Sequence, residues 1–240
     1  MRTRRLKGAL GLTLALQTGA CGFHAYSPPS GWSRASHVAT AAPGEALLGA
    51  AVHGGGGVFG PELAGGELSF RRGLSQLVEL DGDAGWIQIT DQPRRPVFRG
   101  IMTGRIGIRG RFARDLPHLA WLASVGGGGH VGGGFLAPEV GLQAGWENPW
   151  MTPWVRASAF LSQPLGARPV DLAGESDAGP RVETPLATVG LRLGAGLSLR
   201  WVDFPVRLHL AVHMVHLARF DGPTDTVSHA GLGLEYRLGP

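Results

Sequence analysis

The sequence predicts an all-β protein, an antiparallel up-and-down β-barrel of about ten strands, with eight or twelve strands as alternatives. Three observations predict this class. Strand-like segments alternate apolar and polar residues, short and long connections alternate along the chain, and aromatic residues gather where the segments end. After residue 20, no stretch has a convincing helical period.

The segment 189–201, VGLRLGAGLSLRW, shows the alternation most clearly. The odd-numbered positions carry Val, Leu, Leu, Ala, Leu, Leu and Trp, and the even-numbered positions carry Gly, Arg, Gly, Gly, Ser and Arg. We call these two sets of alternate positions the apolar parity and the polar parity of a segment. Successive side chains of a strand point to opposite faces, so this period is that of a strand. A helix would scatter the same residues around its axis and bury three glycines, each costing about 1 kcal/mol relative to alanine.

Ten segments follow this pattern, and the connections between them fall into two classes. Short and long connections alternate except at 126–131, a glycine run where the pattern calls for a longer loop. The predicted strands are 45–54, 66–73, 76–89, 98–112, 117–126, 132–146, 152–163, 186–201, 205–220 and 228–239. The short connections are 73–76, 112–117, 147–151 and 202–204, and the long ones are 55–65, 90–97, 164–185 and 221–228.

The composition of the polar parity indicates which face meets water. In 98–112 and 228–239 it consists largely of glycine and arginine, and in 205–220 it carries Arg207, His209, Ala211 and His213. A solvated face of a soluble barrel should instead hold Lys, Glu, Thr and Gln. We therefore expect the apolar face to contact lipid and the polar face to line a lumen. A soluble lipocalin-like lipoprotein that binds an apolar ligand is the alternative.

Aromatic residues support the membrane interpretation, because girdles of such residues mark the two interfaces of a transmembrane barrel. Most of them fall beside the short connections and a few beside the long ones. The first group is Phe112, Trp146, Trp150, Trp154, Trp201 and Phe204, and the second is Trp86, Phe98 and Phe220.

The N-terminus predicts export. Residues 1–20 combine four basic residues with a short apolar run, as in a secretory signal peptide. Thr18-Gly19-Ala20-Cys21 resembles the lipobox of bacterial lipoproteins, which implies lipidation of Cys21, with ordinary cleavage after Ala20 as the alternative. Residues 21–44 have no periodicity and predict a flexible tether, and 45–240 form the barrel domain.

The net charge of +4 does not indicate a nucleic-acid partner. Removal of the signal peptide takes away four of the 22 basic residues and leaves 18 arginines against 18 acidic residues. Cys21 is the single cysteine, so no intramolecular disulfide can stabilise the chain. We therefore expect stability to come from the sheet.

Over 45–240 the chain resembles the small bacterial outer-membrane β-barrel proteins. The resemblance implies an outer-membrane location with both termini in the periplasm, and membrane lipid and the outer-membrane assembly machinery as partners. The chain departs from that class at its end, Tyr236-Arg237-Leu238-Gly239-Pro240, which lacks a terminal Phe or Trp. Pro138 predicts a bulge or a strand end within 132–146.

The charged residues of the polar parity define the candidate site. Confined charges must pair, so we expect a lumen largely filled by arginine-carboxylate pairs, in a non-enzymatic protein that is structural or passes small solutes. The residues selected are Glu79, Arg105, Arg109, Glu139, Arg192, Arg200, Arg207, Glu235 and Arg237, with Arg71, Asp81, Asp83, Arg99, Arg111 and Arg156 on the same parity.

A membrane-embedded hydrolase, either a protease or a lipid hydrolase, is the alternative function. Its candidate residues are Asp81 and Asp83 near one end of a strand, and His209, His213 and His216 on another. We expect no catalytic residues, cofactor or metal, since no spacing typical of those sites occurs. The oligomeric state is left open.

Overall fold

The computed structural model describes residues 26–29, 40–56, 62–90, 99–113, 118–171, 182–200 and 204–238. The predicted signal peptide and Cys21 lie outside these residues. Within them the regular elements are β-strands, and no helix of a length and apolarity that could cross a membrane occurs.

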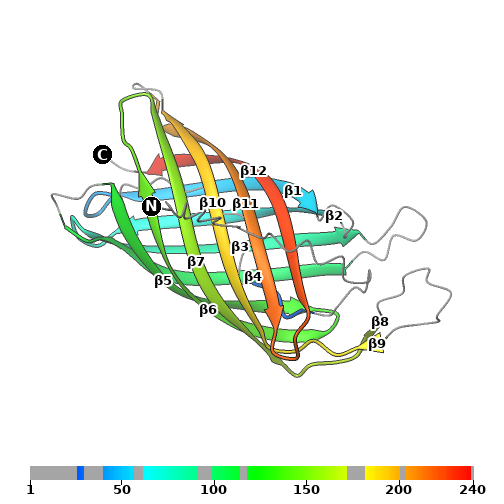
Figure 1. Cartoon of the computed structure of the whole chain (residues 1–240). Coiled ribbons are helices and arrows are strands. Elements are labelled where there is room, and N and C mark those ends of the chain that lie inside the picture. The colour runs from blue at the N-terminus through cyan, green and yellow to red at the C-terminus, as the bar shows by residue number, and fades with distance from the viewer. Residues whose placement is uncertain are drawn as a thin grey trace, which may run out of the picture.

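Ten strands close into one antiparallel barrel (Figure 1), which confirms the predicted fold class and strand number. Each strand pairs with its neighbours in the chain, and β1 pairs with β12 to close the wall. A two-stranded hairpin, β8 and β9, lies in the connection between β7 and β10. The barrel strands are β1 (Ala46–Gly56), β2 (Glu62–Gly73), β3 (Val78–Thr90), β4 (Arg99–Arg111), β5 (Leu119–His130), β6 (Gly133–Gly145), β7 (Met151–Leu165), β10 (Thr188–Arg200), β11 (Val206–Arg219) and β12 (Thr224–Leu238); the hairpin strands are β8 (Val170–Asp171) and β9 (Val182–Glu183).

The two ends of the barrel differ in their connections. We call the end with the β2–β3, β4–β5, β6–β7 and β10–β11 connections the turn end, and the opposite end the loop end. Two loop-end connections are shorter than expected. The glycine run 126–129 lies inside β5, followed by a tight turn at Gly133 (φ 114°), and β12 begins at Thr224 rather than 228, after a turn at Gly222 (φ 111°). Glycine adopts positive φ without a steric penalty, which lets both turns close in a few residues.

Pro138 does not end its strand, contrary to the prediction. β6 runs through it, and Pro138 pairs with Val125 of β5. On the other side, the ladder between β6 and β7 stops after Leu136 and resumes at Glu139 in the same register. The missing N–H of proline therefore interrupts pairing with one neighbour without inserting a bulge.

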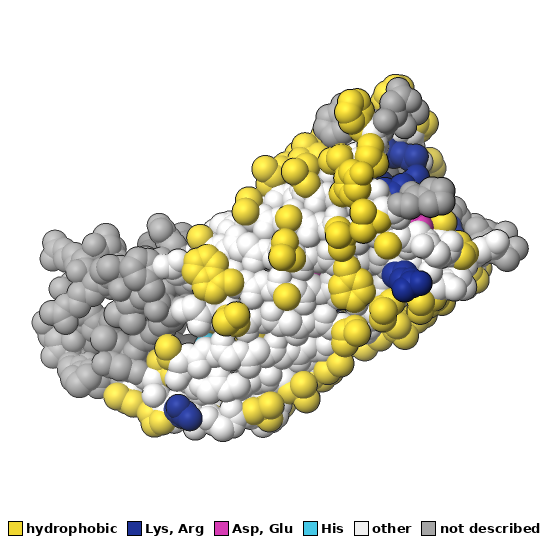
Figure 2. Space-filling model, turned by 180° about the vertical axis from the view of Figure 1, so that it is seen from behind, with side chains coloured by type: hydrophobic (Ala, Val, Ile, Leu, Met, Phe, Trp, Pro, Cys, Tyr) yellow, Lys and Arg dark blue, Asp and Glu magenta, His cyan; other side chains and the backbone are white. Residues whose placement is uncertain are grey.

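The exterior of the barrel is apolar. Along β7, exposed and buried residues alternate strictly for most of the strand, as the sequence pattern predicts. Figure 2 shows hydrophobic side chains spread over the wall and basic side chains mainly toward its ends. Large apolar side chains that are at least 40% exposed include Leu48, Val52, Leu68, Met102, Ile106, Val140, Leu142, Val155, Leu191, Leu193, Leu210, Val212, Met214, Leu232 and Leu234.

Aromatic residues mark both ends of this apolar wall. Phe112, Trp146, Trp150 and Phe204 are exposed at the turn end, and Trp86 and Phe220 are exposed toward the loop end. The prediction was wrong for Trp154, which is 3% exposed and points into the barrel, because its parity on β7 is that of the buried residues. Trp201 and Phe98 lie outside the described residues.

Aromatic side chains lie over glycines of the neighbouring strand at several places. A Cβ added to Gly190 would overlap the ring of Phe160, and one added to Gly196 would overlap the ring of Trp154. Glycine thus provides the space that inward-pointing rings need inside a narrow barrel.

Replacing Gly190 by valine is therefore expected to destabilise the barrel by about 1–3 kcal/mol, because the new side chain meets a ring that packs with Val215 and Leu217. The temperature at which the folded form is lost in detergent would measure this. Gly129→Val is the matched control, since a Cβ at Gly129 meets nothing within 4 Å. An equal loss in both variants would contradict the packing argument.

Candidate functional site

The interior of the barrel is the candidate site, because the inward parity of the strands brings the charged residues together there. Two clusters of ion pairs lie at different depths. The turn-end cluster contains Arg71, Glu79, Arg109 and Glu235, and the mid-lumen cluster contains Asp83, Arg105, Glu139, Arg156 and Arg192.

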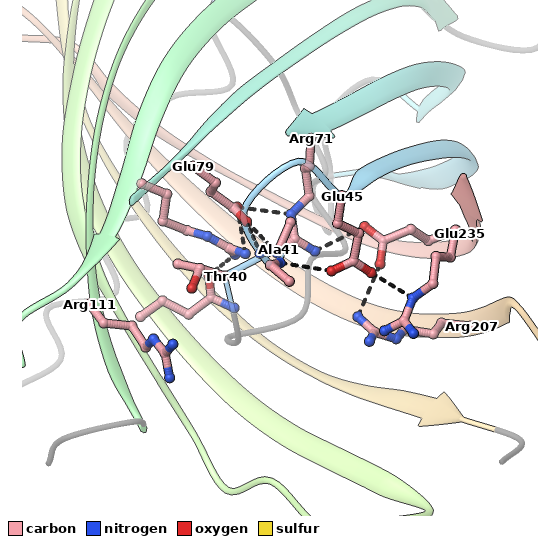
Figure 3. Close-up of polar contacts among 12 residues, drawn as sticks. Thr40, Ala41, Glu45, Arg71, Glu79, Arg111, Arg207 and Glu235 are labelled. Atoms are coloured by element: carbon pink, nitrogen blue, oxygen red, sulfur yellow. Dashed lines mark hydrogen bonds and ion pairs between the residues drawn. The ribbon is translucent and has the colours of Figure 1, made fainter. Parts of the chain in front are cut away.

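Glu79 is the centre of the turn-end cluster (Figure 3). Its carboxylate accepts two hydrogen bonds from Arg71, at 2.9 and 2.8 Å, and forms an ion pair with Arg109 at 2.8 Å. Arg71 also donates to Glu235 at 2.9 Å, so it bridges two carboxylates from opposite halves of the sequence. The bidentate geometry suits the planar guanidinium, and full burial of Glu79 makes these partners necessary.

Glu235 links this cluster to a polar contact that the sequence did not reveal. Arg207 and His209 each lie 3.6 Å from Glu235, and Nδ1 of His209 lies 2.8 Å from the Ser198 hydroxyl. Ser198 and His209 face each other directly across β10 and β11. Their facing parity was visible in the sequence, but the cross-strand register was not.

Glu139 is the centre of the mid-lumen cluster. It accepts a hydrogen bond from Arg156 at 2.8 Å and two from Arg192 at 3.0 and 3.1 Å. Arg105 pairs with Asp83 on the adjacent strand. Relative to Arg109 and Glu79, Arg105 and Asp83 lie four residues further toward the loop end, or about 13 Å along the strands.

The loop half of the lumen combines apolar side chains, which the sequence analysis did not predict, with the buried polar residues His53, Ser162, Thr188 and His229. Two clusters of buried apolar side chains project inward there. They belong to strands whose inward faces carry charged residues nearer the turn end. The first comprises Leu63, Ile87, Ile101, Phe135, Ala137 and Val227, and the second Phe160, Val215 and Leu217 with Tyr26 packed against it.

The mouth at the turn end holds the remaining predicted residues. Arg200 is exposed there, Arg207 is partly buried, and Arg237 forms an ion pair with Glu45 at 2.5 Å. A cavity of about 460 Å³ opens between them, lined also by Arg111 and Glu147. Of the nine predicted residues, the structure therefore places six in the two clusters and three at this mouth.

Comparison with known proteins gives a resemblance of fold. No protein-family model matches the sequence, and no curated protein matches it. Solved structures with a similar fold include Neisserial surface protein A (11% identity, 81% of this chain and 96% of that chain, TM-score 0.41). A second is the N-terminal β-barrel domain of Pseudomonas aeruginosa OprF (14% identity, 82% of this chain and 98% of that chain, TM-score 0.36). A third is P. aeruginosa OprG (11% identity, 85% of this chain and 100% of that chain, TM-score 0.35). At these values the function has to be argued from the residues of this chain.

The residues of the hydrolase alternative lie in separate environments. Asp83 pairs with Arg105 inside the barrel, and Asp81 is also buried there. His213 stacks on His229 in the lumen, whereas His216 is outside, 2.9 Å from the Thr226 hydroxyl. Ser198 and His209 are 2% and 1% exposed, so a substrate has no access to that pair. Among the described residues, no group of His, Cys, Asp or Glu is arranged to hold a metal ion.

Proposed function

We propose that this chain is a bacterial outer-membrane β-barrel with a non-enzymatic, structural role and a lumen closed by ion pairs. One observation carries the proposal. Large apolar side chains are exposed around the wall and charged side chains are buried inside, which is the reverse of the arrangement in a soluble protein. A closed barrel leaves no unpaired strand edge, as spanning a bilayer requires.

The exposure of the wall weighs against a soluble barrel. Leu68 and Met102 are 67% and 68% exposed, and they belong to a wall of similar side chains on all sides. In water such a surface far exceeds the apolar patches of ordinary monomers, whereas in lipid it carries no cost. A lipocalin-like binder would also need an apolar interior throughout, and the turn half of this lumen is charged.

The closed lumen favours a structural role over solute passage. Glu79, Arg109, Glu139 and Arg192 are each at most 2% exposed, so water does not reach them. The apolar cluster around Ile87 and Phe135 is buried in the loop half of the barrel. We therefore expect no steady ionic current when the purified protein is incorporated into planar bilayers, and steady channel currents would favour solute passage.

The orientation follows from the lengths of the connections. In this class short turns face the periplasm, so the turn end, the start of β1 and the end of β12 are assigned to that side. Membrane lipid and the outer-membrane assembly machinery are the partners this implies. Cleavage before Cys21 and its lipidation are part of the same proposal and rest on the leader sequence alone.

The proposal predicts fractionation with outer membranes, resistance to carbonate extraction, and faster migration on a denaturing gel without boiling. Cys21→Ser is the informative variant, because the wall holds the protein in the bilayer without one lipid chain. Retention of the variant in the membrane is expected. Its complete release into the soluble periplasm would overturn the membrane-spanning proposal and favour a soluble lipoprotein.

A further inference from the structure

The mouth at the turn end contains two adjoining cavities that share arginine side chains. The larger has a volume of about 460 Å³ and is lined by Arg111, Arg200, Arg207 and Arg237, and the smaller, of about 240 Å³, is lined by the last three. Arg111 ends β4, and the other three belong to the neighbouring strands β10, β11 and β12 on the opposite side of the barrel. In Figure 3, Arg111 and Arg207 lie on opposite sides of the mouth. Four guanidinium groups therefore surround one opening.

The register of β10 and β11 brings two of these arginines directly opposite each other. Arg200 pairs with Arg207 across the two strands, and like charges at such positions repel. Arg237 adds a third positive charge, two residues after Glu235, the residue opposite Arg207 on β12. The side chain of Arg207 is only 13% exposed, so water screens this repulsion incompletely. One side of the mouth thus holds a concentration of positive charge that an anion would stabilise.

The carboxylates of the mouth balance this charge only in part. Glu45 forms an ion pair with Arg237. Glu235 lies 3.6 Å from Arg207, but it is shared with Arg71, which lies closer, at 2.9 Å. Arg207 therefore has only a share of one carboxylate as its counter-charge.

Arg200 and Arg111 have still fewer partners. Within the part of the chain that the structure describes, the guanidinium group of Arg200 makes no ion pair or hydrogen bond. Arg111 donates to the backbone carbonyl of Gln76 at 2.7 Å, and this neutral acceptor leaves its charge unbalanced. Glu147 also lines the larger cavity, but it is exposed at the rim. Donors on two sides of the mouth are thus available to a ligand.

Part of the segment before β1 completes the larger cavity. Residues 40–43 line it, and the N–H of Ala41 donates to Glu79 at 2.7 Å. At the loop end, the hydroxyl of Ser27 lies 2.7 Å from that of Ser162. The described parts of the segment that the sequence predicts as a flexible tether therefore contact the barrel.

The arrangement of the arginines indicates the kind of anion. A planar carboxylate presents two oxygen atoms in one plane, whereas a phosphate group presents three in different directions and suits guanidinium groups that approach from several strands. A phosphomonoester carries about 1.5–2 negative charges at neutral pH, more than one carboxylate. The larger cavity falls within the range of about 300–1,000 Å³ that is typical of small-molecule sites, so it leaves room for the group that carries the phosphate.

We propose that the turn-end mouth binds a phosphomonoester, with its phosphate between Arg200, Arg207 and Arg237 and its organic part in the larger cavity, toward Arg111. This binding site goes beyond the structural role proposed above, and it depends on the interior of the barrel and not on its lipid-facing wall. A soluble molecule and a phospholipid headgroup can both supply the same chemical group, and experiment distinguishes them.

Isothermal titration calorimetry tests the site with glycerol 3-phosphate as the probe, on the folded protein in a neutral detergent. Saturable binding is expected, and Arg200→Gln is expected to weaken it about tenfold, which is the cost of one charge-assisted contact. Because Arg200 repels Arg207, this variant should be at least as stable as the unchanged protein, so a loss of binding would not come from unfolding. Arg72→Gln is the matched control, because Arg72 is exposed on the outer wall at the same end.

Absence of saturable binding, or equal weakening by Arg200→Gln and Arg72→Gln, would overturn the site. Malonate is the control ligand, since its two negative charges lie on carboxylates, and binding as tight as that of glycerol 3-phosphate would overturn the assignment to phosphate. In vesicles of phosphatidylcholine that contain phosphatidic acid, competition with glycerol 3-phosphate would assign the site to a lipid headgroup, and no competition would assign it to a soluble molecule. The detergent measurements do not depend on the membrane-spanning function, whose failure would appear in carbonate extraction instead.

Discussion

Glu139→Gln is expected to lower the stability of the folded barrel by about 3–5 kcal/mol, because it leaves the buried guanidinium groups of Arg156 and Arg192 without their shared carboxylate. Both arginines are at most 3% exposed, so water cannot replace the lost partner. The measurement is the temperature at which the unboiled, fast-migrating form disappears, together with planar-bilayer conductance.

Two variants make this result specific. Glu147→Gln removes an acidic residue from the exposed rim of the turn-end mouth and should leave stability unchanged. Adding Arg192→Met to Glu139→Gln should restore part of the loss, because it removes one of the buried positive charges that the Glu139 carboxylate balanced. Unchanged stability of Glu139→Gln together with steady ionic currents would instead mean that the lumen is wet and conducts.

Leu193→Arg is expected to cost about 2–4 kcal/mol and to impair assembly, because it places a charge in the middle of the apolar wall. Leu193 is 40% exposed in the middle of β10, between Met214 of β11 and Ala157 of β7. If this face of the barrel were in water, the same substitution would barely change stability. A loss of stability would therefore show that Leu193 faces lipid, and it would not be explained by the barrel fold alone. The amount of folded protein in outer membranes measures it.

Leu193→Phe and Tyr236→Arg are the matched controls. The first keeps the position apolar and should assemble normally. The second places arginine near the turn end, where the wall already exposes Arg72, and should cost only about 0–1 kcal/mol. Equal tolerance of Leu193→Arg and Tyr236→Arg would contradict the assignment of this face to lipid.

Most of the strands could be predicted from the sequence, since a period of two is a local property. The pattern over 189–201 predicts β10 to within a residue or two at each end, and it also predicts which side of β10 is buried. The errors arise where one residue type supports two structures. Glycine at 126–129 suggested a loop and lies in a strand, and Trp154 suggested an interface and lies in the lumen, where Gly196 leaves space for its ring.

The sequence by itself determined that alternate residues would face opposite sides and that arginine and carboxylate would share one of them. Only the tertiary structure decided which charges meet. Arg71 and Glu235 are 164 residues apart, and Arg192 and Glu139 are 53 apart, and they meet because barrel closure and strand register set their depths. The same register places Ala41 on Glu79 and Ser27 on Ser162. The physical reason is that side-chain alternation depends on neighbouring peptide units, whereas depth in a lumen depends on how all ten strands are staggered.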